Sequence, residues 1–423
     1  MQLKKMASQR LTLLFQQTAT PLLRGSVLAH AAGWCEWNNS CRSAYPRAMT
    51  TLIYLDNNAT TPMLPDVVEV VARVMRDCFG NPGSPHRAGR KARQVLEESR
   101  EQIALLLDAD PKELIFTSGG TEANNLALRG LTHGLTGTIA LSPGEHPSSL
   151  EVCRAPAMRA WSLHKFPVDP RGQITSCELP SDTRLAAVIL AHNETGVVQD
   201  VQPLAAACRS RGVPLHLDGV QAVGKIAVSF RDLDTTTLSF GAHKFHGPRG
   251  VGGLLVRDGT RLTPLMRGGH QELERRPGTE PVALVAGMAR ALELACAAMD
   301  ERTRFVTGLR DRLQTALIEL CSPAIVNGDG TARLPNTLNI SFPGVDGEAL
   351  LVALDLEGVC CSLGSTCASG SAEPAPILVA MGLTPDLYRS AVRFSLSILN
   401  TQAEIADAAR CIGQVVARLR NSQ

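Results

Sequence analysis

The sequence predicts an α/β fold in which a mainly parallel sheet is flanked by helices and followed by a smaller α+β domain. Three observations support this prediction. Short β-prone stretches alternate with helical patterns from about residue 66 onward, which is typical of parallel sheets. These stretches are apolar almost throughout, as expected for strands that are buried on both faces. After a long helical region the pattern changes to strands that alternate between apolar and polar residues.

The elements of the first part follow in order along the chain. Behind Pro65, apolar residues at helical spacing predict a helix over 66–76, and a longer helix is expected over 91–107. Ligands of such sheets gather at the carboxyl ends of the strands. The expected strands cover 114–117, 138–141, 185–191, 214–217, 237–240 and 254–256, and helices intervene, for example up to residue 128 and over 201–211.

The second part follows helices that we expect over 282–299 and 304–320. The stretches 338–342 and 392–396 alternate like half-exposed strands, and an alanine-rich helix over 403–419 ends the chain. Domain-size statistics suggest a large domain at 66–306 and a small C-terminal domain at 307–423. Residues 51–65 are expected to form an N-terminal segment that packs on the small domain.

The bulk composition excludes several classes of protein. Hydrophobic residues make up 44% and charged residues 19% of the chain, which is ordinary for a soluble globular enzyme. The net charge of +2 and the 4% aromatic content give no basis for nucleic-acid binding. No apolar run approaches the roughly 20 residues of a membrane helix. We therefore expect neither a nucleic-acid partner nor a membrane.

The cysteines show no metal-binding pattern. Twelve occur, without a C-x-x-C pair or another spacing typical of zinc sites. We expect no structural metal site, and we interpret most of the cysteines as small buried hydrophobic residues in a reducing compartment.

Residues 1–50 differ in composition from the rest of the chain and form a predicted N-terminal extension. Their single acid, Glu36, stands against six basic residues: Lys4, Lys5, Arg10, Arg24, Arg42 and Arg47. This is compatible with an organelle transit peptide. We favour the alternative of a start codon placed too early, because globular patterning begins just after Met49. The expected location is therefore cytoplasmic, with a mitochondrial location as the alternative.

Lys244 is the most informative residue of the chain. It follows the strand over 237–240 and lies among small residues, with the Gly247-Pro248 turn behind it. Small neighbours let a flat ring approach the backbone. A lysine in a desolvated pocket loses its proton easily and becomes a nucleophile, able to bond an aldehyde cofactor. Most lysines are solvated surface charges, so Lys244 alone is weak evidence.

Asp218 strengthens the interpretation of Lys244. It ends the strand over 214–217 and precedes Gly219 and Gln221. A carboxylate there could keep a pyridine nitrogen protonated, which makes the ring an electron sink. An aspartate at a strand end is more often a helix cap. The combination with a lysine at the end of the next strand favours pyridoxal phosphate.

Three other strand ends carry polar groups. Gly120 and Thr121 open a helix, where amides, the helix dipole and a hydroxyl could form a phosphate cup. His146 could stack on a flat ring and move protons near neutral pH. Asn193 could donate a hydrogen bond to a phenolate oxygen. Each motif also fits an ordinary turn, since Asn, Gly and His are common in loops.

Two residues of the second part are candidates for substrate chemistry. Cys367 lies in the small, polar segment 362–371, where an accessible thiolate could meet a ligand. With eleven other cysteines in the chain, it could also be there by chance. Arg393 lies mid-strand between apolar neighbours, and its planar fork would suit a substrate carboxylate if it points inward. A surface-facing arginine is the equally weighted alternative.

Taken together, these residues closely resemble the cysteine desulfurases of the class V aminotransferase group. The resemblance runs from Tyr54 to nearly the end, and its details look like the NifS-like branch. It implies a fold-type I pyridoxal phosphate enzyme with a seven-stranded sheet. The blocks that carry it are Tyr54–Pro62, Phe79–Pro82, His216–Asp218 with Gln221, Gly268–Glu272 with Arg275, Arg276, Gly278 and Thr279, and Gly364–Gly370.

The resemblance also implies roles for these residues. Lys244 would hold the cofactor covalently and later move the Cα proton, Asp218 would pair with the pyridine nitrogen, and His146 would stack on the ring as acid and base. Gln221 and Asn193 would contact the phenolic oxygen, and Arg393 with Asn193 the substrate carboxylate. Gly120, Thr121 and His243 would bind the phosphate. Thr279 would reach the phosphate of the partner subunit, which implies a homodimer.

The implied activity is desulfuration of L-cysteine. Cys367 would take the substrate sulfur as a persulfide, release alanine, and pass the sulfur to an iron–sulfur scaffold or another acceptor protein. Cys367 could also ligate an iron–sulfur cluster transiently. The alternatives are a selenocysteine lyase, a cysteine sulfinate desulfinase or another class V lyase or aminotransferase. A non-catalytic sulfur-relay or scaffold protein is a third reading, which the intact Lys244, Asp218 and Cys367 disfavour.

Three positions depart from the family pattern. Gly241 stands where a serine usually contacts the phosphate, so one hydroxyl contact is missing. Leu273-Glu274 replaces an Arg-Gly pair, which removes a positive charge near the expected dimer contact. Ser397-Ile398 stands where a glycine usually follows the strand of Arg393.

Overall fold

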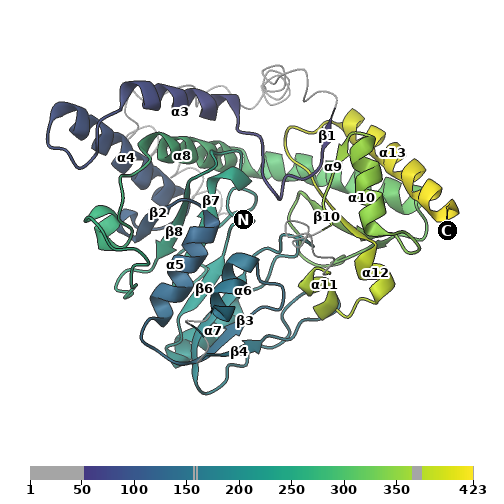
Figure 1. Cartoon of the computed structure of the whole chain (residues 1–423), viewed down its shortest axis with the longest axis horizontal. Helices are drawn as coiled ribbons and strands as arrows, with labels where there is room; N and C mark the ends of the chain where they lie inside the picture. Colours follow the sequence, from purple (N-terminus) through teal and green to yellow (C-terminus); the bar gives the residue numbers. More distant parts are fainter. Residues whose placement is uncertain (1–51, 156–157, 159–160, 364–373, 423) are drawn as a thin grey trace, which may run out of the picture. The chain divides into compact units, whose positions relative to one another are not determined.

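The computed structural model describes residues 52–155, 158, 161–363 and 374–422. A seven-stranded sheet with helices packed on it forms the first part of the described chain (Figure 1). Its strand order is β2-β8-β7-β6-β5-β3-β4. The strands are β2 (Leu114–Thr117), β3 (Gly137–Leu141), β4 (Trp161–Lys165), β5 (Thr183–Ile189), β6 (Leu215–Asp218), β7 (Thr237–Gly241) and β8 (Gly252–Val256).

The sheet is mainly parallel, which confirms the predicted fold class. Only β8 pairs antiparallel, with both β2 and β7. The residues of β6, β7 and β8 are all buried, including the polar residues His216, Asp218 and Ser239. The edge strand β4 was missed, because exposed polar residues such as Ser162 and Lys165 interrupt its apolar pattern.

The helices of the first part pack around this sheet. In Figure 1, α3, α4 and α8 lie grouped together, and α5 packs across β5 to β8. The longest, α4, begins four residues before the predicted start, because the His86 side chain caps it by accepting from Gly89 N at 3.2 Å. The helices are α3 (Pro65–Asp77), α4 (Arg87–Leu106), α5 (Gly120–Thr132), α6 (Pro147–Arg154), α7 (Gln202–Arg211) and α8 (Val282–Ala297), with 3₁₀ turns η2 (Pro111–Glu113), η4 (Ala242–Lys244) and η5 (Gln271–Glu274).

The second part contains a three-stranded antiparallel sheet of order β12-β10-β9. Helix α9 packs against α13, and α13 against α10. The predicted domain boundary at 306/307 falls inside α9, and it stays a prediction. The elements are α9 (Met299–Leu320), β9 (Ile325–Val326), β10 (Thr337–Ser341), α10 (Gly347–Leu356), β11 (Val359–Cys360), α11 (Pro376–Ala380), α12 (Pro385–Arg389), β12 (Ala391–Ser395) and α13 (Gln402–Asn421).

The expectation of half-exposed strands in this part is wrong. Every residue of β10 and β12 is buried. The polar residues of these strands can be buried because they form hydrogen bonds. Asn339 Oδ1 accepts from Asn327 Nδ2 at 2.7 Å, and Ser395 Oγ accepts from the amide of Asn58 at 2.9 Å. Polar alternation here therefore marks buried contacts, not solvent.

The segment before α3 connects the second part to the segment that carries Lys244. Strand β1 (Ile53–Tyr54) pairs in parallel with β11. Further along, the amide of Thr61 donates to the carbonyl of His243 at 3.0 Å. The same short segment therefore contacts two regions that are distant in sequence, and Asn58 and Ala59 lie between these contacts.

The cysteines are less buried than expected. Of the nine in the described part of the chain, Cys153, Cys208 and Cys321 are buried and the other six are half-buried, all as free thiols. The expectation that most are buried is therefore wrong for this set. No single described helix is long and apolar enough to cross a membrane, although the bent pair α8 and α9, at 77°, meets the criteria of length and composition together.

Candidate active site

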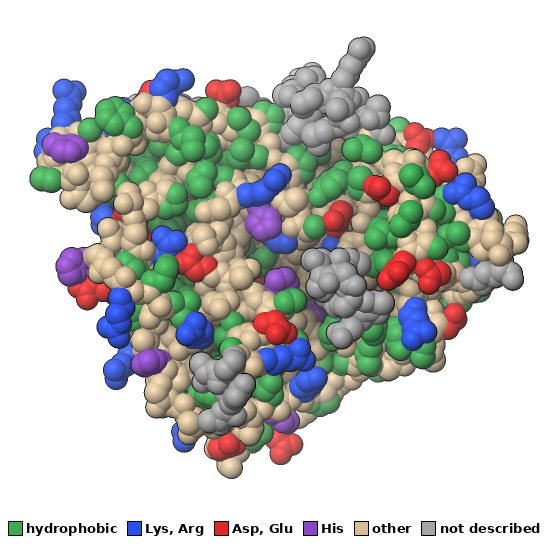
Figure 2. Space-filling model, viewed as in Figure 1, with side chains coloured by type: hydrophobic (Ala, Val, Ile, Leu, Met, Phe, Trp, Pro, Cys, Tyr) green, Lys and Arg blue, Asp and Glu red, His purple; other side chains and the backbone are tan. Residues whose placement is uncertain are grey.

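The predicted site residues follow four neighbouring strands at their carboxyl ends. His146 comes after β3, Asn193 after β5, Asp218 ends β6, and Lys244 follows β7. Because these strands run parallel, the residues meet at one edge of the sheet. Figure 2 shows histidine and Lys or Arg side chains grouped around the middle of the face that lies over this edge.

Lys244 presents its amine to two backbone carbonyls. Its Nζ donates to the oxygen of Asn58 at 2.6 Å and to that of Ala59 at 2.8 Å. Burial, and then the positive charge of Arg393, lower the pKa of Lys244 to about 8, against the pull of Asp218. A substantial fraction of the amine is therefore neutral near pH 8 and nucleophilic, as a covalent bond to an aldehyde requires.

Asp218 is a buried carboxylate that two donors orient. Asn124 Nδ2 donates to its Oδ2 at 2.7 Å, and the amide of Val220 donates to its Oδ1 at 3.0 Å. Asn124 Oδ1 pairs with His216 Nε2 at 3.1 Å, and burial lowers the pKa of His216 to about 4. His216 is thus neutral, and the network leaves Asp218 as the local negative charge. Asn124 was not predicted as a site residue, because in the sequence it looks like any other polar residue of a helix.

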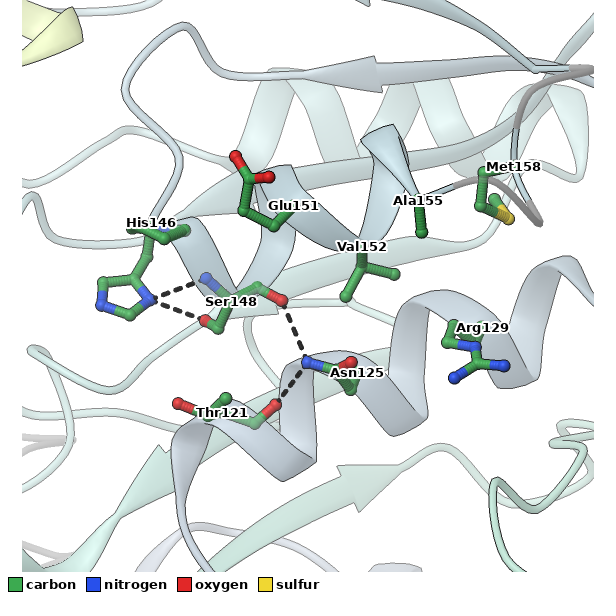
Figure 3. A pocket seen from close by; sticks show the side chains of 10 residues that line it. Thr121, Asn125, Arg129, His146, Ser148, Glu151, Val152, Ala155 and Met158 are labelled. Atoms are coloured by element: carbon green, nitrogen blue, oxygen red, sulfur yellow. Dashed lines mark hydrogen bonds between the residues drawn. The ribbon is translucent and has the colours of Figure 1, made fainter. Parts of the chain in front are cut away.

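His146 caps α6 and faces the same region. Its Nδ1 accepts from the amide of Ser148 at 3.1 Å, so the ring proton belongs on Nε2. Burial lowers the pKa of His146, although the charge of Asp218 opposes this. His146, Ser148, Asn125 and Thr121 line a hollow of about 600 Å³. Figure 3 shows these side chains around α5 and α6. The imidazole is therefore a neutral group that can take up a proton.

The N-terminus of α5 forms a glycine-lined cradle. A Cβ on Gly120 would lie 2.5 Å from Val220 Cγ2, so a larger residue there would require the Val220 side chain to move. A Cβ on Gly241 would lie 3.4 Å from the amide nitrogen of Gly120, which places Gly241 directly beside the helix amides. Thr121 is exposed at the same end. Burial lowers the pKa of His243 to about 4, so His243 can offer a neutral ring. These are donors of the kind that bind phosphate.

Gln221 and Asn193 are held by their neighbours. Gln221 is buried and donates from Nε2 to the carbonyl of Asn58 at 2.9 Å. Asn193 Nδ2 donates to Glu194 Oε1 at 2.6 Å, beside Arg393. The structure thus places the Gln221 amide next to the Lys244 amine and the Asn193 amide next to the arginine.

Arg393 points inward and is only 5% exposed. Its two terminal nitrogens donate to Asp56 Oδ1 and to Glu194 Oε1, each at 2.8 Å. Burial raises the pKa of Glu194, while the charge of Arg393 opposes this. Because the Arg393 charge also lowers the pKa of Lys244, the guanidinium belongs to the same site. Glu194 and Asp56 were not predicted, since nothing local in the sequence indicates their shared partner.

Two predicted site residues are not brought into this group. Thr279 is exposed, in the segment behind η5. That segment is tied to the first turn of α5 by an ion pair between Arg276 and Glu122 at 2.8 Å. Cys367 lies outside the described residues, as does the N-terminal extension 1–50.

Comparison with known proteins identifies the family. Residues 53–407, most of the chain, match the aminotransferase class-V family. The chain belongs to this family. A cysteine desulfurase from Nostoc sp. is 40% identical over 376 residues, which are 88% of this chain and 94% of that protein. The cysteine desulfurase NifS of Azotobacter vinelandii is 38% identical, over 87% and 94% of the two chains.

Solved structures agree with this assignment. A NifS-like protein superimposes with a TM-score of 0.80 at 33% identity, and covers 87% of this chain and 100% of its own. A structure of SspA in complex with cysteine gives 0.72 at 29%, over 82% and 99%. The fold is therefore that of the NifS-like, fold-type I enzymes, as predicted.

Pyridoxal phosphate is the cofactor of this family and of this protein. The residues present fit it. The glycine cradle at α5 leaves room and amides for the phosphate. Buried Asp218 supplies the charge that a pyridine nitrogen needs, and Lys244 supplies an amine of lowered pKa.

Proposed function

We propose that the protein is a cysteine desulfurase, which converts L-cysteine to L-alanine and transfers the sulfur to Cys367. The observation that carries the proposal is the arrangement of three charged groups at one edge of the sheet. The charges of buried Asp218 and buried Arg393 both act on the Lys244 amine, which has a pKa of about 8.

The cofactor site can be assigned residue by residue. When bound, pyridoxal phosphate withdraws electrons from the substrate bonds next to the amino group. Asp218 would hold the ring nitrogen, the α5 N-terminus with Thr121 and His243 the phosphate, and Gln221 the phenolic oxygen. His146 would lie against the ring. The hydrogen bonds described above fix the positions of the Asp218, His146 and Gln221 side chains.

Lys244 and Arg393 would handle the substrate. The released Lys244 amine can take the Cα proton, because its pKa of about 8 keeps a useful fraction unprotonated. Arg393 would bind the substrate carboxylate with Asn193 alongside. Its fork is already held between Asp56 and Glu194, so the guanidinium is oriented before the substrate arrives.

Sulfur transfer balances with a single protein thiol. The Cβ–S bond of the substrate breaks, and an S–S bond forms between the substrate sulfur and Cys367, which becomes a persulfide. The Cβ carbon takes up a proton and leaves as the methyl group of alanine. No external oxidant or reductant is needed for this half of the reaction.

Further proposals concern the partners and the location of the protein. The persulfide sulfur would pass to an acceptor protein, for which we propose an iron–sulfur scaffold. We also propose a homodimer and a cytoplasmic location, with mitochondria as the alternative if residues 1–50 are a transit peptide. Fractionation of cells that produce the full-length chain would decide between the two locations.

The deciding experiment measures sulfide and alanine released from L-cysteine with dithiothreitol present. We expect release by the wild type and none by Cys367→Ser, while the matched control Cys360→Ser keeps its activity. Equal release by both variants would exclude Cys367 as the sulfur acceptor. No release from L-cysteine by cofactor-loaded wild type, with release of selenide from selenocysteine, would establish the lyase alternative.

A further inference from the structure

A second lysine lies beside the Lys244 site. Lys225 follows β6 and is four residues after Gln221. Its Nζ donates to Asn58 Oδ1 at 2.8 Å and also to Gln221 Oε1. Burial, followed by the charges of Lys244 and Arg393, lowers the pKa of Lys225 well below its usual value. Burying a lysine amine costs free energy, so the hydrogen bonds that Lys225 makes must offset this cost.

The chemistry of these contacts fixes the orientation of Gln221. A backbone carbonyl and the oxygen of a glutamine amide only accept hydrogen bonds, whereas a lysine amine can donate them whether or not it is protonated. With Oε1 turned to Lys225, the Nε2 group must face the opposite side, and it donates to the carbonyl of Asn58 at 2.9 Å. That carbonyl also accepts from Lys244 Nζ at 2.6 Å. The N–H side of Gln221 is therefore held next to the Lys244 amine.

Asn58 is fixed by the same lysine and by the second part of the chain. Its Oδ1 accepts from Lys225 and, at 3.0 Å, from Asn336 Nδ2. Its Nδ2 donates to the carbonyl of Asn193 and to Thr337 Oγ1, each at 2.9 Å. Asn58 is 1% exposed, so these bonds are made without competing water. Lys225 is thus at one end of a hydrogen-bond network, in which the Asn58 side chain cannot rotate without breaking its bonds.

We propose that Lys225 is a positioning residue, which holds the Gln221 amide with its N–H side toward the phenolic oxygen of the cofactor. This inference rests on the proposed function, in which Gln221 contacts that oxygen. Without Lys225, the amide loses one of the two hydrogen bonds that favour this orientation. If the amide turned over, its carbonyl would face the phenolic oxygen, and two acceptors would repel each other.

The test is a double-mutant cycle on the holoenzyme, with Lys225→Met, Gln221→Leu and the double variant. The dissociation constant of pyridoxal phosphate is measured together with the pH at which the absorbance of the bound cofactor changes. We expect each single variant to weaken binding about fivefold to tenfold, as for one lost hydrogen bond. We also expect the midpoint pH of the absorbance change to rise. A hydrogen bond donated to the phenolic oxygen stabilises its deprotonated form, so losing that bond means the proton is lost only at a higher pH.

The decisive comparison is the double variant. If Lys225 acts through Gln221, Lys225→Met changes nothing further in the Gln221→Leu background. Effects that add would overturn the proposal, because Lys225 would then act independently of Gln221. A shift by Lys225→Met with a silent Gln221→Leu would overturn it as well. A wild type that binds no pyridoxal phosphate would instead overturn the proposed function, and the inference with it.

Two further variants guard against a purely structural effect. Lys225→Gln retains a side chain that can donate to Gln221 Oε1, so we expect it to restore part of the binding and of the midpoint. Asn57→Ala is the matched control. Asn57 is buried and lines the same cavity as Lys225, but its amide donates to the carbonyls of Tyr54 and Ser395. We expect its absorbance midpoint to equal that of the wild type, and a shift like that of Lys225→Met would contradict the proposal.

Discussion

Gly241 lies where a side chain would face the N-terminus of α5. Its φ of −139° is ordinary for any residue, and an added Cβ would lie 3.4 Å from Gly120 N, which is normal contact. A serine therefore fits without moving the backbone. Its hydroxyl would add a donor to the phosphate cradle, which is the contact that the family pattern leads one to expect.

We predict that Gly241→Ser tightens the binding of pyridoxal phosphate. A hydrogen bond to a charged group contributes about 1.5–3 kcal/mol, so the dissociation constant should fall by about tenfold or more. Equilibrium dialysis of the apoenzyme with the cofactor measures this. Gly241→Ala is the control, since it adds the Cβ without the hydroxyl and should leave the affinity near that of the wild type. Equal tightening by both variants would contradict the role of the hydroxyl.

The sequence could predict single residues whose chemistry is visible locally. Lys244 and Asp218 stand at strand ends, and parallel strands bring such ends together whatever the details of packing. Asn58 and Lys225 could not be found this way. Their contact joins positions 167 residues apart in the chain, and no periodicity encodes it. The direction of Arg393 was open for the same reason, because its two carboxylate partners lie on other segments.

At the scale of elements, η5 holds three consecutive residues in the left-handed region. Glu272, Leu273 and Glu274 have φ values of 48°, 56° and 64°. Glu272 is anchored, because its carboxylate is buried and accepts from Arg100 at 2.6 Å and from the amide of Phe116 at 2.9 Å. Among the described residues, Glu274 has no such anchor beyond an exposed contact between its Oε1 and His270 Nδ1 at 2.7 Å. This is the position where the family usually has a glycine.

We predict that Glu274→Gly stabilises the holoenzyme by about 0.5–1 kcal/mol. Relief of the left-handed strain is worth about 1–2 kcal/mol, and the greater freedom of glycine in the unfolded chain offsets part of it. Loss of the exposed contact with His270 costs little. For a chain of 423 residues, with about 2.1 cal/mol/K of unfolding entropy per residue, this corresponds to a Tm higher by about 0.6–1.1 °C. Glu274→Ala keeps the Cβ and should not raise the Tm, so a matching rise in both variants would refute the strain argument.

The elements that sequence reasoning found and missed differ in how they are buried. The central strands are rich in apolar residues and buried on both faces, and they were placed to within about two residues. The strands β10 and β12 were found, but their exposure was misjudged, because buried hydrogen bonds mimic a polar outer face. Short elements such as β9 and β11 carry too few residues for any period to show.

At the scale of the whole molecule, the open question is which site Thr279 serves. Thr279 is exposed in a single chain. The ion pair of Arg276 with Glu122 nevertheless holds its segment beside α5, whose amides form the phosphate cradle. Two arrangements follow: Thr279 completes the cradle of its own chain, or it reaches that of a partner subunit. We propose the second, because an exposed hydroxyl gains little in its own chain and would be buried in a homodimer.

Mixed dimers separate the two arrangements. We predict that Thr279→Val homodimers bind pyridoxal phosphate about fivefold to tenfold more weakly, for one lost hydrogen bond, and that Lys244→Ala homodimers are inactive. A mixed dimer contains one Thr279→Val chain and one Lys244→Ala chain. If Thr279 reaches the partner's site, the Thr279→Val chain supplies Lys244 and its partner supplies Thr279, so one of the two sites is complete. At limiting cofactor, activity per dimer should then recover to about half that of the wild type. If Thr279 serves its own chain, the only site with Lys244 lacks Thr279, and the mixed dimer would keep the weak cofactor affinity of the Thr279→Val enzyme.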